Sequence, residues 1–330
     1  MAHRGMPIAL DQPSPLPAKP RVAVFANPFL PPAKLRRYFA AVGETFPNLA
    51  SPFNAVQAGS PREAEQRAKE AIEGGAELLL AIGGDGTLQS LANAVYGSPA
   101  ALGILPAGGG NDFASALGVP REPVRAVQSL RMGKLRCVDL LRARTADGQE
   151  RLYCGGGGVG LDADAAGYAA AKLRRFPGKT RYLLSALAAL RHYSPKRVRV
   201  EFLDTSEEAI EQKMMVAAAL NTPTYGAGLR IAPEAQINDG KLNLVLVGDL
   251  SALEILRALA QWAATNRLHS PRIQRRSATR VRVLADPPSL FHADGEILGW
   301  TPVEISVVPN AIRVLVPCDE AEGPSKDPLL

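Results

Sequence analysis

The chain has 330 residues, of which 46% are hydrophobic, 21% charged and 5% aromatic, with a formal net charge of +6. This composition excludes collagen-like, coiled-coil and wholly disordered proteins, and the length predicts two domains. No apolar run approaches the roughly 18 residues of a membrane-spanning helix, and we expect no secretory signal. Three separated cysteines without a CxxC pair are typical of a reducing cytoplasm. The positive charge suits an anionic partner without choosing among nucleotide, nucleic acid and membrane.

The first part of the chain alternates strands, glycine loops and helices. Residues 1–20 hold five prolines and are expected to form a flexible arm. Apolar runs predict strands at 21–26, 77–82 and 102–105, and helical patterns are centred on 61–74 and 88–95. A short helix is expected after residue 111, ending at 118–120. Strand, loop and helix in repetition predict a parallel α/β domain over 21–135, with its loops at the carboxyl ends of the strands.

After about residue 134 the pattern changes to short apolar or alternating runs separated by turn residues. These runs cover 197–203, 214–220, 242–247, 280–285, 303–308 and 311–316. Their spacing favours an antiparallel sheet or sandwich over 136–310, interrupted by helices around 165–193 and 252–268. The last strand, near 311–317, is a candidate to return to the first domain, and 318–330 is expected to be a tail.

Two glycine loops are candidate phosphate-binding sites. Gly83–Thr87 lies between a buried strand and a helix, so its backbone N–H groups and the helix dipole favour an anion. The carboxylate of Asp85 would repel phosphate unless a cation lies between them, which suggests a Mg²⁺–nucleotide site. The alternative is a strand–helix turn that binds nothing. Pro106–Asp112 repeats the setting one unit later, although Asn111 and Asp112 could simply cap a helix.

A third glycine loop, Gly155–Gly160, matches the GxGxxG pattern of dinucleotide-binding proteins. Such a site needs an acidic residue roughly 20 positions later, but no Asp or Glu occurs between 165 and 200. We therefore interpret this segment as a packing or substrate-facing loop.

Six segments follow one another in a distinctive order. The two longest signals are GGDGT at Gly83–Thr87 and PAGGGNDFASALGVP at Pro106–Pro120. The others are Asn27-Pro28, Tyr153–Asp162, Asn221–Leu242 and the HADGE of His292–Glu296. Together they resemble the diacylglycerol kinase catalytic domain, and more narrowly the bacterial soluble lipid kinases related to diacylglycerol and sphingosine kinases. NAD kinases share only the first of these motifs.

The resemblance implies an α/β N-terminal domain with a parallel sheet, of the NAD kinase/diacylglycerol kinase type, and a mainly antiparallel β-sandwich C-terminal domain. It implies transfer of phosphate from ATP to a lipid hydroxyl, diacylglycerol-like or sphingoid, with Mg²⁺ as cofactor. The implied general base is Glu296, with Asp85 organising Mg²⁺ and Asp294 shaping the turn or the metal's surroundings. The implied ATP-binding residues are Asn27, Gly83, Gly84, Asp85, Gly86, Thr87, Leu88, Gln89, Gly109, Asn111 and Asp112.

Two departures from the family pattern concern the phosphates. The family usually continues Asn-Pro-x-Ser-Gly, whereas Phe29, Leu30 and Pro31 follow here. It also has a Thr where this chain has Gly109. Both missing hydroxyls would lie near the nucleotide phosphates, so the mode of phosphate binding is open.

The resemblance also implies a structural Mg²⁺ at a tight turn, held by Asp239 and by the backbone carbonyls of Gln236 and Lys241. Residues 172–200 contain nine basic residues and no acid, and 267–282 is also free of acids. These stretches are either solvated faces or a surface for reversible docking on an anionic membrane. We expect a cytoplasmic, membrane-visiting enzyme that binds no nucleic acid; a homodimer is a further arrangement to be considered. The alternatives are an NAD-kinase-like kinase of a soluble hydroxyl and a non-catalytic nucleotide or lipid sensor.

Overall fold

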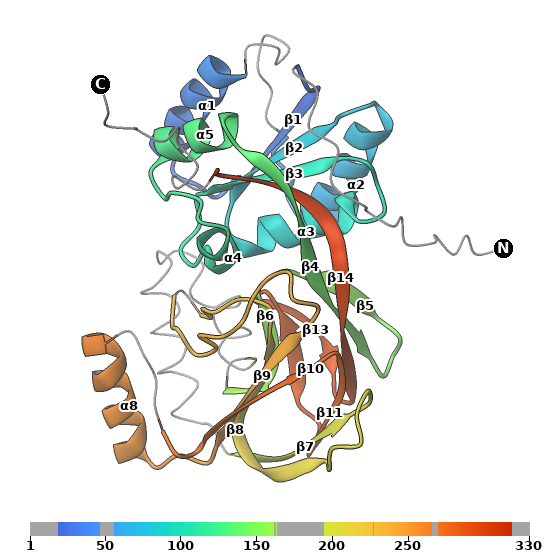
Figure 1. Cartoon of the computed structure of the whole chain (residues 1–330), viewed down its shortest axis with the longest axis vertical. Helices are drawn as coiled ribbons and strands as arrows, with labels where there is room; N and C mark the ends of the chain where they lie inside the picture. Colours follow the sequence, from blue (N-terminus) through green and yellow to red (C-terminus); the bar gives the residue numbers. More distant parts are fainter. Residues whose placement is uncertain are drawn as a thin grey trace, which may run out of the picture.

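The structure, a computed structural model, describes residues 19–46, 56–161, 163, 195–226, 228–265 and 270–318. They form an N-terminal α/β region and a C-terminal β-rich region (Figure 1). Four predicted segments lie wholly or mostly outside the described residues. They are nearly all of the N-terminal arm, the helical insert at 165–193, most of the basic stretch 172–200 and nearly all of the tail. None of the helices in the described part of the chain combines the length and apolar character needed to cross a bilayer.

The N-terminal region is built on parallel strands, as its apolar runs predict. These are β1 (Val22–Ala26), β2 (Leu78–Gly83) and β3 (Ala101–Pro106), with β2 in the middle. Every residue of β2 and β3 is buried, which explains why their sequences are apolar without alternation. The helices are α1 (Pro32–Thr45), α2 (Pro61–Glu73), α3 (Asp85–Val95), α4 (Asp112–Ala116) and α5 (Pro123–Arg131).

The C-terminal region is mainly antiparallel, which confirms the predicted fold class. Its described strands are β4 (Lys134–Thr145), β5 (Glu150–Tyr153), β6 (Gly156–Gly160), β7 (Lys196–Phe202), β8 (Ile210–Leu220), β9 (Leu242–Gly248), β10 (Ile273–Ala278), β11 (Arg280–Asp286), β12 (Leu290–Ala293), β13 (Glu296–Trp300) and β14 (Val303–Val316). One described helix, α8 (Ala252–Thr265), belongs to this part of the chain. The inner faces of the strands enclose an apolar core of their own, separate from that of the N-terminal region.

Two long strands run from one region into the other. The predicted strands 303–308 and 311–316 are one continuous strand, β14, which bulges between Val308 and Ile312 and pairs along its length with β4 (Figure 1). The end of β14 adds to the first sheet in parallel with β3, where Arg313 lies opposite Ala101. The chain therefore passes between the regions on β4 and returns on β14.

The glycine segment expected to be a loop is a strand. Gly156–Gly160 forms β6, which pairs with both β8 and β12, so the loop interpretation was wrong. A Cβ on Gly156 would lie 2.4 Å from a methyl carbon of Leu220, and one on Gly157 would lie 2.5 Å from the carbonyl oxygen of His292. Only glycine fits at this closeness, so Gly156 and Gly157 allow β6 to pack tightly against its neighbours.

A buried carboxylate, that of Asp139, forms hydrogen bonds where β4 and β14 pass between the two regions. Asp139 of β4 is 1% exposed, and its Oδ1 accepts the N–H of Asn310 at 2.8 Å while its Oδ2 accepts the N–H of Gly240 at 2.7 Å. The amide of Asn221 donates to the carbonyl oxygens of Asp139 and Cys154. One cluster thus ties β4 to the bulge of β14 and to the turn before β9. Sequence reasoning missed Asp139, because nothing in its neighbourhood marks it.

Candidate functional site

The two predicted phosphate loops lie against each other at the carboxyl ends of β2 and β3. The Cα of Gly108 lies 3.2 Å from where a Cβ on Gly84 would be, and the N–H groups of Ala107 and Gly108 both donate to the carbonyl oxygen of Gly83. A Cβ on Gly108 would lie 2.5 Å from the Cα of Gly84, so position 108 requires glycine unless the loops shift. The prediction that both loops share one rim of the sheet is therefore confirmed.

The second loop is braced from within by Asn111. Its side chain accepts the N–H of Gly108 and donates to the carbonyl of the same residue, at 3.0 and 2.8 Å. The backbone N–H of Asn111 donates to Oδ2 of Asp85 at 3.0 Å, which links the loops directly. Asn111 has a left-handed φ of 57°, a conformation that asparagine tolerates better than most residues. The structure therefore gives Asn111 a bracing role in the loop.

Asp85 stands at the first position of α3 in an electrostatically unfavourable place. Burial, followed by the negative charges of Asp112 and Asp294, raises its pKa to about 7, although the backbone amides of Phe113 and Asn111 act in the opposite direction. Its Oδ1 is inaccessible to solvent and has no hydrogen-bond partner among the described residues. A cation would stabilise a carboxylate held in this way, and the role of Asp85 in organising Mg²⁺ stays a prediction.

The Asp-Gly-Glu segment forms the turn between β12 and β13. Asp294, with a left-handed φ of 47°, accepts three consecutive backbone N–H groups. Its Oδ2 accepts from Cys154 at 2.7 Å, and its Oδ1 accepts from Gly155 and Gly156 at 2.9 and 3.1 Å. Both carboxylate oxygens are thus engaged by the start of β6. Of the two roles implied for Asp294, the structure supports shaping the turn.

Glu296 leaves this turn and reaches the first phosphate loop. Its Oε1 lies 3.6 Å from where a Cβ on Gly86 would be, so the carboxyl of the C-terminal region meets the start of α3 in the N-terminal region. Burial raises the pKa of Glu296 and the charge of Asp294 adds to this, whereas the Arg151 guanidinium lowers it. A raised pKa strengthens a carboxylate as a proton acceptor.

His292 supports the same turn from behind. Its Nδ1 accepts the N–H of Gly295 at 3.2 Å, so in the neutral ring Nε2 carries the proton and faces the hydroxyl of Tyr225 at 2.6 Å. The two rings stack with centroids 6.0 Å apart. These contacts give His292 a structural role in the turn, and Tyr225, its partner, gave no signal in the sequence.

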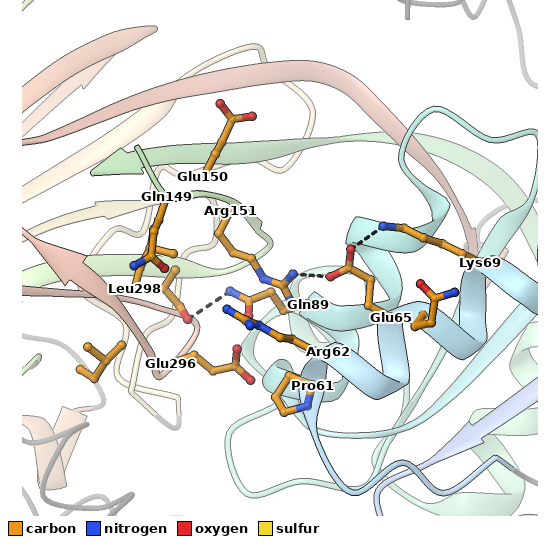
Figure 2. Close-up of a pocket in the computed structure, with 13 residues that line it drawn as sticks. Pro61, Arg62, Glu65, Lys69, Gln89, Gln149, Glu150, Arg151, Glu296 and Leu298 are labelled. Carbon is orange, nitrogen blue, oxygen red and sulfur yellow. Dashed lines mark hydrogen bonds and ion pairs between the residues drawn. The ribbon is translucent and has the colours of Figure 1, made fainter. Parts of the chain in front are cut away.

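A pocket of about 420 Å³ opens between α2, the start of β5 and the β12–β13 hairpin. Figure 2 shows the side chains of Arg151 and Glu65 directed toward each other, with Arg62 and Gln89 nearby and Glu296 below them in the view. Charged and polar groups dominate its lining. Such a lining suits a polar ligand or the polar end of a larger one, and not an acyl chain.

Helix α3 also contacts the C-terminal region directly. The side-chain amide of Gln89 donates to the carbonyl of Ala293 at 3.1 Å, which fixes the helix beside the Asp-Gly-Glu turn (Figure 2). Asn93, one turn later, donates to the carbonyl of Leu152 and accepts its N–H. These hydrogen bonds hold α3, which begins at the phosphate loop, beside the hairpin that carries Glu296.

An ion pair in the pocket wall joins the two regions. Arg151 of β5 pairs with Glu65 of α2, which also binds Lys69 at 2.7 Å, and the side chains of Arg151 and Glu65 are each 18% exposed. Arg151→Gln is expected to lower the free energy of unfolding by about 1–3 kcal/mol, because Glu65 stays part-buried with one partner fewer. A urea double-mutant cycle with Glu65→Gln measures the coupling.

The exposed pair Arg37–Glu122 is the matched control, for which less than about 1 kcal/mol is expected. Burial opposes ionisation of Glu65, but Lys69 and Arg151 hold its pKa below 4.5. The stabilisation of the folded chain by the Glu65–Arg151 ion pair is therefore present above about pH 4.5, and it is lost as pH falls through the lowered pKa of Glu65. A coupling no larger than that of the control pair would show that Glu65 and Arg151 do not hold the regions together.

Comparisons with known proteins bear on this arrangement. Residues 21–143 match the diacylglycerol kinase catalytic domain, and residues 157–316 match the YegS C-terminal NAD kinase beta sandwich-like domain. A diacylglycerol kinase from Mycobacterium tuberculosis is 30% identical over 263 residues, which is 79% of this chain and 84% of that protein. This chain belongs to the diacylglycerol kinase family.

Other family members agree with this assignment. A Klebsiella pneumoniae protein named "Probable lipid kinase YegS-like" is 31% identical over 255 residues, covering 76% of this chain and 81% of that protein. A crystal structure of a diacylglycerol kinase from Bacillus anthracis shares the fold, with a TM-score of 0.66 at 17% identity over 91% of this chain and 97% of the other.

Other predicted residues of this diacylglycerol kinase family member lie along the same rim. Asn27 follows β1, and its Oδ1 accepts the N–H of Phe29 at 2.9 Å. Thr87 packs its side chain over Gly83, where a Cβ would lie 2.4 Å from Oγ1 of the threonine. Leu88 is buried in the N-terminal core, so its side chain supports the loop from beneath.

The turn expected to hold a structural Mg²⁺ is separate from this site. Gln236, Asp239 and Lys241 are all exposed, and Oδ1 of Asp239 accepts the N–H of Lys241 at 3.0 Å. Among the residues that the structure describes, no group of three Asp, Glu, His or Cys side chains gathers as a metal site. One side-chain carboxylate with backbone carbonyls is compatible with a weak hard-cation site, which stays a prediction.

Proposed function

We propose that this family member is an ATP-dependent lipid kinase that transfers the γ-phosphate of ATP to the hydroxyl of a diacylglycerol-like or sphingoid lipid. The observation that carries the proposal is the approach of Glu296 to Gly86 across the two regions. It brings a carboxyl group of raised pKa to the loop whose geometry suits phosphate. A proton acceptor beside a phosphate site is the minimal arrangement for phosphoryl transfer to a hydroxyl.

The donor phosphates would bind on the first turn of α3. Helix N-termini leave their first N–H groups without intrahelical acceptors, and the cap residue Gly84 has no side chain to satisfy them. Gly109 lies on the neighbouring loop. Backbone N–H groups of both loops therefore lie at the same rim of the sheet. There they would stabilise a chain of phosphates without the two side-chain hydroxyls that this chain lacks.

Asp85 would hold Mg²⁺ near these phosphates, with Asp112 contributing negative charge. The support is the buried Oδ1 of Asp85 without a partner and the mutual repulsion of nearby carboxylates. A bound Mg²⁺ neutralises charge on the phosphates. The ionised form of Asp85, which burial disfavours, would be favoured by that cation.

Glu296 would accept the proton of the lipid hydroxyl. Asp294 and His292 fix the turn from which it projects, through the three amides of the 154–156 segment and through Gly295. The base thus comes from a rigid hairpin, as efficient proton transfer requires. The polar pocket next to Glu296 would receive polar parts of the reactants.

An assay with γ-labelled ATP tests the proposal. The acceptors are diacylglycerol, monoacylglycerol and sphingosine in mixed micelles, with NAD as a soluble acceptor. Label in a lipid is the expected result. Label in NAD would favour a soluble-acceptor kinase, and bound ATP without label in any acceptor would favour a sensor; either outcome would contradict the proposal.

The enzyme would visit an anionic membrane to reach its substrate. Of the basic stretch 267–282, the described arginines are partly neutralised: Arg272 pairs with Glu254, and Arg280 and Arg282 pair with Glu304. Docking would then depend mainly on other basic residues. Co-sedimentation with vesicles containing anionic lipid is expected at low salt and is expected to weaken at high salt. Absence of binding at low salt would contradict it.

A further inference from the structure

Two cations brace the second glycine loop from outside. Lys34, in the first turn of α1, donates from Nζ to the carbonyl oxygen of Ala107 at 2.7 Å. Arg121, between α4 and α5, donates to the carbonyl oxygen of Gly110 at 2.9 Å. Both ends of the segment Ala107–Gly110 therefore carry a positive charge, supplied by residues that lie outside the six family segments or just beyond them.

These two charges are not balanced by acids. In the described part of the chain neither Lys34 nor Arg121 forms an ion pair, and the neighbouring Glu122 is engaged by Arg37 at 2.7 Å and caps α5. Burial and then the charge of Arg121 lower the pKa of Lys34, so the two cations repel one another. Cations held together beside a glycine loop, each with only a carbonyl as partner, are a place where an anion would be stabilised.

The loop between them has free backbone donors. The N–H groups of Gly109 and Gly110 donate to no acceptor among the described residues. The N–H of Gly108, by contrast, donates to the carbonyl oxygen of Gly83 and to Oδ1 of Asn111. Gly109 stands where the family has a threonine, and Leu30 and Pro31 stand where it has the serine and glycine of Asn-Pro-x-Ser-Gly. One of the two missing hydroxyls, that of the threonine replaced by Gly109, would belong to the loop that both cations contact.

We propose that Lys34 and Arg121 bind the phosphate chain of the nucleotide, in place of the hydroxyls that this chain lacks. The inference rests on the proposed use of ATP and names additional residues of that site. Exchange of neutral hydroxyls for cations makes binding depend on phosphate charge, so affinity should rise steeply with the number of phosphates and fall with salt.

Calorimetric binding of Mg·ATP, Mg·ADP and adenosine to the full chain tests this. Lys34→Gln and Arg121→Gln are each expected to weaken Mg·ATP binding about 10-fold, to weaken Mg·ADP less and to leave adenosine unchanged. Lys34→Arg is expected to restore most of the affinity. Arg36→Gln removes the same charge from an exposed position of α1 and is expected to have little effect. In turnover, KM for ATP is expected to rise with KM for the lipid unchanged.

Three outcomes are decisive. Equal losses for ATP and adenosine would show that the cations only brace the loop, and would overturn the inference. Unchanged ATP affinity in both Gln variants would overturn it too, with the proposed function intact. If the wild type binds no ATP but binds tripolyphosphate in a manner that needs Lys34, the proposed donor is wrong and the anion site stands.

Discussion

Glu296→Gln is expected to lower kcat for lipid phosphorylation by about 10²–10⁴-fold, the usual contribution of a positioned general base. The amide keeps the shape of the carboxyl but cannot accept the proton of the hydroxyl. Since the side chain of Glu296 contacts the loop and forms no hydrogen bond with the residues that the structure describes, the fold and the affinity for ATP are expected to be retained. Steady-state kinetics with parallel calorimetry of Mg·ATP separates the two effects.

Glu150→Gln is the matched control, because Glu150 lines the same pocket but is exposed and pairs with Arg142 at 3.4 Å. It undergoes the same chemical change without approaching Gly86, and its kcat is expected to stay within about twofold of wild type. Comparable activity in the Glu296 and Glu150 variants would remove Glu296 from the role of base.

Asp85→Asn is expected to abolish activity while stabilising the ligand-free protein. Loss of the charge that would hold Mg²⁺ is expected to cost at least about 100-fold in kcat. Asparagine still accepts the N–H of Asn111, and it removes a carboxylate that burial, Asp112 and Asp294 all disfavour in its charged form. Activity and stability should therefore change in opposite directions, as at many functional sites.

The pH dependence of that stabilisation follows from the raised pKa of Asp85, about 7 in the folded chain against an ordinary value of 3.8. Below pH 4 the group is protonated in both folded and unfolded states, and wild type and variant should differ little. The destabilisation of the wild type by ionised Asp85 grows as pH rises from 4 to 7 and is constant above 7. Melting temperatures measured with EDTA should favour the variant by about 2–4 °C at pH 8 and by less at pH 5.

Asp249→Asn, at an exposed position, controls for the loss of one negative charge. Its melting temperature is expected to follow that of the wild type at both pH values. A variant at Asp85 that is less stable than the wild type at pH 8 would show that the carboxylate is already stabilised by the protein, and that no cation is needed there.

The parallel sheet and its loops were predictable, because β2 and β3 are buried on both faces and are therefore continuously apolar. The first glycine loop and its neighbour were predictable together, because parallel strands bring their carboxyl ends to one edge. Helix α1 was missed: its buried face is only Leu35, Tyr38, Ala41 and Val42, set among basic residues after two prolines. The fusion of two strands into β14 was also missed, since Pro309 and Asn310 suggest a turn where the strand only bulges.

Within the site, short motifs identified the residues that lie near the loops but not those that join the regions. Glu296 and Asp85 stand in recognisable segments. Arg151 and Glu65 are 86 positions apart in ordinary-looking sequence, and only the folded chain brings them together. Asn111 was expected near the nucleotide, which stays a prediction, and the structure adds that its side chain is hydrogen-bonded to Gly108. A side chain's hydrogen-bond partners depend on the fold, which residue type and spacing do not determine.

We expect one nucleotide site to be formed by the loops of the N-terminal region and the Asp-Gly-Glu hairpin of the C-terminal region. Hydrogen–deuterium exchange with and without a non-hydrolysable Mg·ATP analogue tests it most directly. We expect slower exchange at 83–88, at 107–112 and at 294–297, with no change in the remote strand β10. Protection confined to one region, or absent from all three segments while the analogue is bound, would contradict it.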